Sequence, residues 1–180
     1  MSKILTFLWD TVKIVLIAFI IVWPIRQFLF QPFMVSGQSM EPNYFSDDYL
    51  VVEKISYQFR EPIRGEVIVF QYPNDPSIMH IKRIIGLPGE TIKTSEEGVR
   101  IISEEGIFFL DESDYLSYTT LFTERSLTLK KDEFFVMGDN RGASLDSRNW
   151  GPLPRENIRG KVFARLFPFY RFQIMIAPIY

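Results

Sequence analysis

The chain of 180 residues contains no cysteine, and this absence excludes several kinds of chemistry at once. Without thiols the protein has no disulfide framework, no thiolate metal site or iron–sulfur cluster, and no cysteine nucleophile. Its single histidine, His80, also excludes a metal site built from several imidazole rings. Catalysis would therefore fall to hydroxyl, carboxylate, amine or guanidinium groups, or to that one imidazole.

The chain also lacks a large excess of either charge. Lys and Arg number 20 and Asp and Glu number 22, which gives a formal net charge of −2. Because proteins that bind nucleic acid usually carry a basic surface, we expect no nucleic acid among the partners. Aromatic residues make up 16% of the chain, which favours a β-rich core or a membrane contact over disorder.

An uncharged apolar run lies near the N-terminus, where residues 14–25 read IVLIAFIIVWPI. As a helix this run would span about 18 Å of a hydrocarbon core that is about 30 Å thick. Continuing it to Phe30 gives about 25 Å, if the Arg26 side chain extends towards the lipid headgroups. We therefore predict a cytoplasmic tip and a transmembrane anchor in residues 1–33. A cleaved secretory signal and a soluble amphipathic helix are the alternatives.

From Tyr49 onward, short apolar runs alternate with turn residues, which is typical of an antiparallel β-domain. The runs that read as strands are YLVVEKI, EVIVFQY, IMHIKRII, TIKT, VRII and IFFL. A meander is the simplest topology for them. We therefore expect a mostly β fold, with one membrane helix before an extracytoplasmic antiparallel domain in residues 34–180, and a small β-excursion in residues 89–133.

The last apolar stretch, residues 162–180, is interrupted too often by Arg and Pro to be a second membrane span. It predicts closing strands that carry an aromatic surface, either in the core or facing a membrane. The aromatic residues concerned are Phe163, Phe167, Phe169 and Phe172.

The strand expected at residues 78–85 places Lys82 and Arg83 on opposite faces, so burial of either face buries a basic residue. A buried lysine can lose as much as 3–5 units from its usual pKa of about 10.4, whereas arginine stays charged. Lys82 is therefore a candidate neutral general base. The alternative is that these side chains only pair with carboxylates.

The best placed nucleophile is a serine in the loop SGQSMEP, residues 36–42, where Gly and Pro allow a sharp bend. Such a bend exposes a hydroxyl and directs amide N–H groups at a developing oxyanion. The sequence has neither a G-x-S-x-G nor an S-x-x-K motif. A Ser-His-Asp triad would need His80, whose apolar neighbours favour a buried structural histidine.

A third polar cluster, residues 138–151, reads GDNRGASLDSRNWG. Its two aspartates, Asp139 and Asp146, can form ion pairs with Arg141 and Arg148 and so hold the loop in one conformation. The spacing lacks the full ligand set of a calcium loop, so no metal is expected.

Taken together, these segments resemble the bacterial type I signal peptidases, which are membrane-anchored serine proteases with a Ser-Lys dyad. The resemblance covers most of the chain in the family's order and spacing. The matching segments are FLFQPFMVSGQSMEPN, DYLVVEK, RGEVIVF, IKRIIGLPGE and FFVMGDNRGASLDSRNWGPLP.

By this resemblance Ser39 matches the nucleophile, Lys82 the general base, and Ser144 the residue that orients the lysine amine. The residues that match the supporting network of the loop are Asp139, Asp146 and Arg148. Met40 matches a residue that packs beside the site. Gly37 stands where some members carry a serine that assists the oxyanion, so the backbone N–H of Ser39 becomes the chief donor expected.

Two other positions depart from the usual pattern. Asn43 stands where Thr is usual, and Glu66 replaces the commoner Asp. The resemblance implies no metal and no cofactor.

The implied function is a membrane-bound serine endopeptidase that removes N-terminal signal peptides from secretory preproteins at the outer face of the plasma membrane. Cleavage would follow a small residue that has another small residue two positions earlier. The lipid bilayer is an expected partner, and the secretion translocon is a further candidate. The alternatives are a self-cleaving Ser-Lys protease of the LexA type and a catalytically silent, membrane-anchored β-module.

Overall fold

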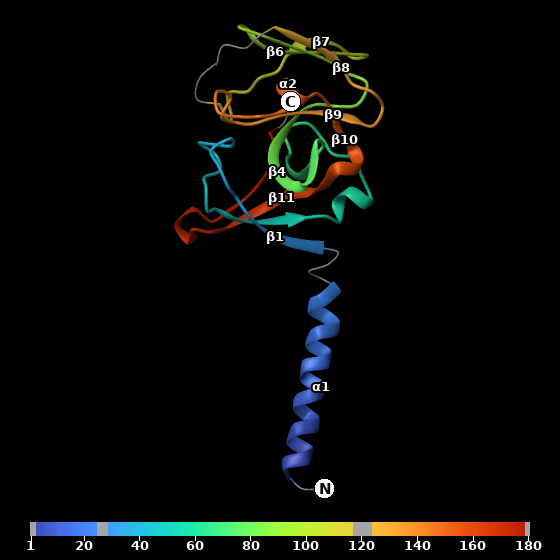
Figure 1. Ribbon diagram of the computed structural model, residues 1–180, viewed down its shortest axis with the longest axis vertical. Helices are drawn as coiled ribbons and strands as arrows, with labels where there is room; N and C mark the ends of the chain where they lie inside the picture. Colours follow the sequence, from blue (N-terminus) through green and yellow to red (C-terminus); the bar gives the residue numbers. More distant parts are fainter. Residues whose placement is uncertain (1–2, 25–28, 117–123, 179–180) are drawn as a thin grey trace.

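The N-terminal helix α1, Lys3–Pro24, extends away from the rest of the protein in the computed structural model (Figure 1). The structure describes residues 3–24, 29–116 and 124–178. The 22 residues of α1 rise by about 33 Å, which matches the thickness of a hydrocarbon core. The large apolar side chains from Ile4 to Trp23 are all more than half exposed, as they would be if lipid surrounded them.

The prediction that the membrane helix continues to Phe30 is wrong. Phe30 begins strand β1, Phe30–Met34, which pairs with β2, Tyr49–Glu53. The helix instead gains its length on the N-terminal side of Ile14, where Lys13 and Asp10 form an ion pair of 3.1 Å on its surface. Arg26 and the remainder of residues 25–28 lie outside the described residues.

The described residues form two antiparallel sheets, so the expected mostly β fold is confirmed. The main sheet has the order β1-β2-β11-β3-β4-β9-β10, with β12 beside β11. Its further strands are β3 Val67–Tyr72, β4 Asp75–Gly86, β9 Glu133–Met137, β10 Leu153–Pro154, β11 Ile158–Phe167 and β12 Gln173–Ile174. The short helices are α2 Ser147–Trp150, η2 Ser56–Gln58, η3 Arg155–Asn157 and η4 Phe169–Arg171.

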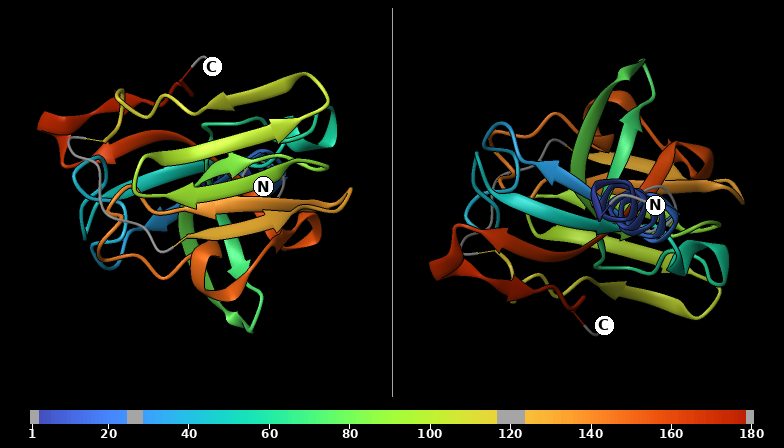
Figure 2. Two further views of the ribbon diagram at one scale, coloured as in Figure 1. Left: turned by 90° about the horizontal axis from the view of Figure 1, so that it is seen from above. Right: turned by 90° about the horizontal axis from the view of Figure 1, so that it is seen from below.

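The second sheet has the order β7-β6-β5-β8, and its strands fall within residues 89–133. They are β5 Thr91–Ser95, β6 Gly98–Ser103, β7 Gly106–Phe109 and β8 Arg125–Thr128. Seen from above, this sheet lies over the β9 side of the main sheet (Figure 2). Phe135 and Met137 of β9 are buried in one cluster with Ile92 and Ile101 of the small sheet. Hydrophobic burial therefore attaches the small sheet to β9.

A meander does not describe the main sheet, because β11 lies between β2 and β3. Val162 of β11 is buried in one cluster with Val52 of β2 and Val67 of β3. The strand also bonds to both neighbours along its backbone. Strand β11, from the C-terminal part of the chain, thus lies between β2 and β3, which follow each other in the sequence.

The predicted aromatic surface is on the outside of the molecule. Phe163, Phe167, Phe169 and Phe172 are 40%, 48%, 80% and 59% exposed. Of the two places predicted for these rings, the structure excludes the core. Residues 179–180 of this stretch lie outside the described residues.

Strand pairing brings the three polar segments together. Arg83 of β4 is opposite Met137, the last residue of β9, so the chain after β9 passes beside Lys82. The loop after β1 is closed at its base, because the N–H of Val35 donates to the carbonyl of Asp48 over 3.0 Å. The register of the main sheet thus positions the loop that carries Ser39 and the loop that carries Ser144.

Candidate active site

Ser39 and Lys82 are in direct contact, although 43 residues separate them in the sequence. The Lys82 Nζ donates to the Ser39 Oγ over 2.7 Å and to the carbonyl oxygen of Ile81 over 2.9 Å. Lys82 is buried, while Ser39 is half-buried and can be reached from solvent. A nucleophile and a base are therefore within hydrogen-bond distance of each other.

Burial lowers the pKa of Lys82 from its ordinary value of 10.5 to about 8. Desolvation is the largest cause, since it destabilises the ammonium form. The negative charges of Asp146 and Asp139 act in the opposite direction, and Arg148 lowers the pKa again. The amine therefore loses its proton more readily than an ordinary lysine does.

The Asp146 carboxylate organises the loop after β9. It accepts hydrogen bonds from the Ser144 hydroxyl at 2.6 Å and the Gly138 N–H at 3.0 Å, and from the Arg148 Nε and Nη2, both at 2.8 Å. Burial alone would raise the pKa of Asp146, but the hydrogen bonds and charge of Arg148 hold it below its ordinary value. Asp146 therefore remains ionised although it is fully buried.

Gly138 lets this loop approach Ser39 closely. A Cβ atom at this position would lie 2.3 Å from both the Ser39 carbonyl oxygen and the Ser144 Oγ. The N–H of Asn140 then donates to that same carbonyl of Ser39 over 3.0 Å. A side chain at Gly138 would therefore push the Ser39 loop and the Ser144 loop apart.

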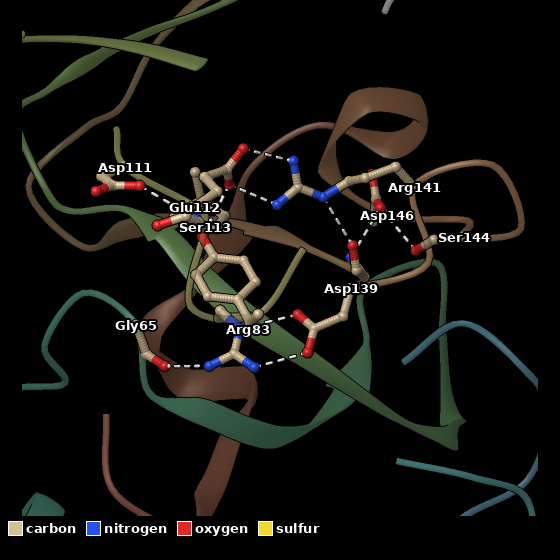
Figure 3. A network of polar contacts seen from close by, with 12 residues as sticks. Gly65, Arg83, Asp111, Glu112, Ser113, Asp139, Arg141, Ser144 and Asp146 are labelled. Carbon is tan, nitrogen blue, oxygen red and sulfur yellow. Dashed lines mark hydrogen bonds and ion pairs between the residues drawn. The ribbon is translucent and has the colours of Figure 1, made fainter. Parts of the chain in front are cut away.

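A second buried ion pair lies on the other side of β4. The guanidinium of Arg83 donates to both carboxylate oxygens of Asp139, over 2.8 Å and 2.6 Å, and to the carbonyl of Gly65 over 2.9 Å (Figure 3). Asn43 donates to Asp139 as well, over 2.8 Å. This pair therefore links β4, the loop after β9 and the loop that carries Ser39.

The structure places the residues expected at the site as follows. Lys82 bonds to Ser39, whereas Arg83 forms the carboxylate pair that was the alternative for both basic residues. Ser144 lies beside Ser39, and its hydroxyl donates to Asp146. Met40 is buried in one cluster with Ile81, the neighbour of Lys82.

Gly37 is exposed and has a φ of +92°, a conformation that favours glycine. His80 is half-buried, and its ring stacks on Tyr72 with a centroid distance of 4.9 Å. Arg141 pairs with Glu112 rather than with an aspartate of its own loop.

The sequence interpretation missed Asn43, Gly138 and Glu112 as contributors to the site. Asn43 had a signal, since it departs from the residue usual in the resembling family. Gly138 had none, because its role depends on how closely two loops approach. Within the described residues, no group of three or more His, Asp and Glu side chains is placed to hold a metal ion.

Comparison with known proteins gives consistent matches. The family model described as signal peptidase, peptidase S26, matches residues 8–167. A Synechocystis protein named "Probable signal peptidase I-2" is 37% identical, covering 88% of this chain and 73% of its own length. Signal peptidase I P of Bacillus subtilis subsp. natto is 34% identical and covers 90% of both chains. A solved signal peptidase I of Enterococcus faecalis V583 aligns with a TM-score of 0.48 and 28% identity, over 57% of this chain and 97% of that one.

The burial of Lys82 can be tested directly by its reactivity. We expect acetylation of its amine, followed by mass spectrometry, to rise through a midpoint near pH 8. Asp146→Asn should move the midpoint to lower pH, because it removes a charge that raises the pKa and leaves Arg148 uncompensated. A midpoint near pH 10 in the wild type would contradict the desolvation of this amine.

Proposed function

Because this chain belongs to the signal peptidase family, peptidase S26, and removes signal peptides as a serine protease, we propose that Ser39 is its nucleophile and Lys82 its general base. The 2.7 Å contact between the Lys82 Nζ and the Ser39 Oγ carries this proposal. No metal or cofactor takes part in the proposed reaction, which is the Ser-Lys variant of triad chemistry.

The proton moves along this contact. When Lys82 is neutral, the hydroxyl of Ser39 donates to its amine, and the proton passes to the amine as Oγ attacks the scissile carbonyl. The protonated amine then supplies a proton to the leaving nitrogen, and water hydrolyses the acyl-enzyme. With a pKa of about 8, about a tenth of Lys82 is neutral at pH 7.

The negative oxygen of the tetrahedral intermediate needs hydrogen-bond donors. Within the described residues, no hydrogen bond occupies the backbone N–H of Ser39. The exposed turn at Gly37 leaves space for a substrate beside it. We assign the Ser39 N–H as the chief oxyanion donor, in a loop supported by Met40.

The loop after β9 orients the lysine. Ser144 donates its proton to Asp146, so its oxygen is available to accept a hydrogen bond from the amine of Lys82. Arg148 neutralises Asp146, and Arg83 neutralises Asp139. These are positioning roles, since none of these groups need touch the substrate.

The substrates are preproteins that carry signal peptides. We propose that cleavage follows a small residue with another small residue two positions earlier, as the resemblance to the family implies.

Replacing either member of the dyad should abolish cleavage of a preprotein in detergent or vesicles. We expect Ser39→Ala and Lys82→Met to lower kcat by about a thousandfold or more, because each removes a group that changes its bonding in the transition state. In the wild type, kcat/KM should rise with pH through about 8 as Lys82 loses its proton.

Sequencing the new N-terminus of the product identifies the bond that is cut. Phe59→Ser, an exposed substitution away from the dyad, serves as the matched control. Full activity of Ser39→Ala, or a flat profile between pH 6 and 9, would overturn the assignment of the dyad.

The family is associated with membranes, and α1 is long and apolar enough to cross one. We propose that the chain crosses the plasma membrane once, with a cytoplasmic N-terminus and with the two sheets, which begin at Phe30, on the extracytoplasmic side. The secretion translocon would be a neighbour there, because preproteins emerge from it on that side.

The orientation can be tested with one thiol, because the chain has no cysteine of its own. Glu97→Cys, on the surface of the small sheet, should react with a membrane-impermeant maleimide in intact cells. Lys3→Cys, at the other end of α1, should react only after the cells are permeabilised. The reverse pattern would show the opposite orientation.

We further propose that the aromatic surface of β11 and η4 lies against lipid. The ring of Phe163 packs against Phe30, the first residue of β1, at a centroid distance of 5.8 Å. One end of the aromatic surface therefore lies beside β1, the strand that follows the anchor in sequence. Arg171 holds the η4 turn by donating to Asp48 over 2.9 Å.

A photoreactive phenylalanine analogue tests this lipid contact in reconstituted vesicles. At position 169 it should form lipid adducts several times more often than at position 59, where the native Phe59 is 81% exposed on the η2 turn. Equal adduct yields at the two positions would contradict lipid contact at η4.

A further inference from the structure

A short segment that follows β7 of the small sheet contacts residues next to the dyad. The segment, residues 111–116, follows the end of β7, where the Leu110 N–H donates to the Val99 carbonyl over 2.8 Å. The Ser113 N–H donates to the Asp111 carboxylate over 3.0 Å, and the Leu116 N–H to the Glu112 carbonyl over 2.9 Å. These bonds give the segment a folded turn, in which Tyr115 is almost fully buried.

Glu112 joins this turn to the loop that carries Ser144. Its carboxylate accepts from both terminal nitrogens of Arg141, over 2.8 Å and 2.5 Å (Figure 3). The side chain of Arg141 is 1% exposed and that of Glu112 is 10% exposed, so solvent screens this pair little. The Arg141 Nε donates to the Gly138 carbonyl over 2.9 Å. Glu112 therefore holds Arg141, which in turn fixes the start of the loop that carries Ser144.

Tyr115 joins the same turn to the other two parts of the site. The guanidinium of Arg83 lies 4.1 Å from the centroid of the Tyr115 ring, a distance suited to a cation–π contact. The backbone carbonyl of Tyr115 accepts a hydrogen bond from the side-chain amide of Asn43 over 2.8 Å. Arg83 follows Lys82 on β4, and Asn43 lies in the loop that carries Ser39.

The turn itself is tied together by one more bond. The hydroxyl of Tyr115 donates to the Glu112 carboxylate over 2.8 Å, so the two contacting side chains are fixed relative to each other. Because Glu112 already accepts from Arg141, its carboxylate has bonding partners on two sides. One folded turn thus contacts the chain beside the nucleophile, beside the base and beside the loop that orients the base.

We propose that residues 111–116 are a positioning element, in which Glu112 and Tyr115 set the distance between Ser39 and Lys82 from outside the catalytic centre. Neither side chain bonds to Ser39 or Lys82. They act through Arg141, Arg83 and Asn43. The proposal rests on the Ser-Lys dyad proposed above, and it gives the small sheet a role in catalysis.

The test compares Glu112→Gln with the wild type, as full-length protein in detergent acting on a preprotein. The neutral amide keeps the shape of the side chain but not the charge that Arg141 requires. We expect kcat to fall about tenfold, with KM within twofold, because the substrate site is intact while the dyad is misaligned. The pH midpoint should rise, because a looser loop admits water and relieves the desolvation of Lys82.

Three further variants make the result specific. Glu112→Asp restores the charge and should recover part of kcat. Glu97→Gln breaks an exposed ion pair with Arg100 in the same small sheet and should behave as wild type. Tyr115→Phe keeps the ring over Arg83 but removes the bond to Glu112, so kcat should fall about threefold. If Glu112→Gln does not fold, the kcat of Tyr115→Phe tests the proposal in its place.

Thermal unfolding and circular dichroism accompany each assay. If kcat falls only in proportion to the folded fraction, or if KM changes and kcat does not, the segment is merely structural and the proposal is wrong. A kcat within twofold of wild type for folded Glu112→Gln also overturns it. Failure of the dyad itself would be seen separately, as activity retained by Ser39→Ala in the same series.

Discussion

The site depends on keeping a lysine amine dehydrated while two carboxylates lie nearby. Desolvation lowers the pKa of Lys82, but Asp146 and Asp139 act against it and would stabilise the charged form. Each carboxylate is buried together with its own arginine, Arg148 for one and Arg83 for the other. Because the charge of Arg148 acts against those of the carboxylates and desolvation is the largest effect, the amine can be neutral near pH 8.

One of these ion pairs, Arg83 with Asp139, also connects segments that lie far apart in the sequence. Asp139 receives hydrogen bonds from Arg83 on β4 and from Asn43 after the nucleophile. Breaking a buried pair by removing one partner costs about 3–5 kcal/mol, since the other charge stays unpaired. The groups that set the electrostatics of Lys82 therefore also hold the loops in place, so that charge and geometry depend on each other.

Much of the fold and of the candidate site was predictable from local sequence pattern. Alternation along β4 correctly separated Lys82 from Arg83, and the absence of cysteine together with the bent loop of residues 36–42 favoured a serine nucleophile. Three strands of the small sheet, β5, β6 and β7, were visible as short apolar runs between turns, whereas β8 was not predicted. The meander and the C-terminal extension of the membrane helix were wrong, for different reasons. β11 enters the main sheet through pairing across many residues, and Phe30 is apolar enough for either a helix or a strand.

The sequence by itself determined which chemistry was available and which segments would carry it, because residue types and their spacing are local properties. Only the tertiary structure decided that Arg141 pairs with Glu112 and not with Asp139, and that the hydroxyl of Ser144 donates to Asp146. It also decided why residue 138 is glycine, since a Cβ there would meet Ser39 and Ser144. These outcomes depend on the distance between loops, which strand register sets and which no local pattern encodes.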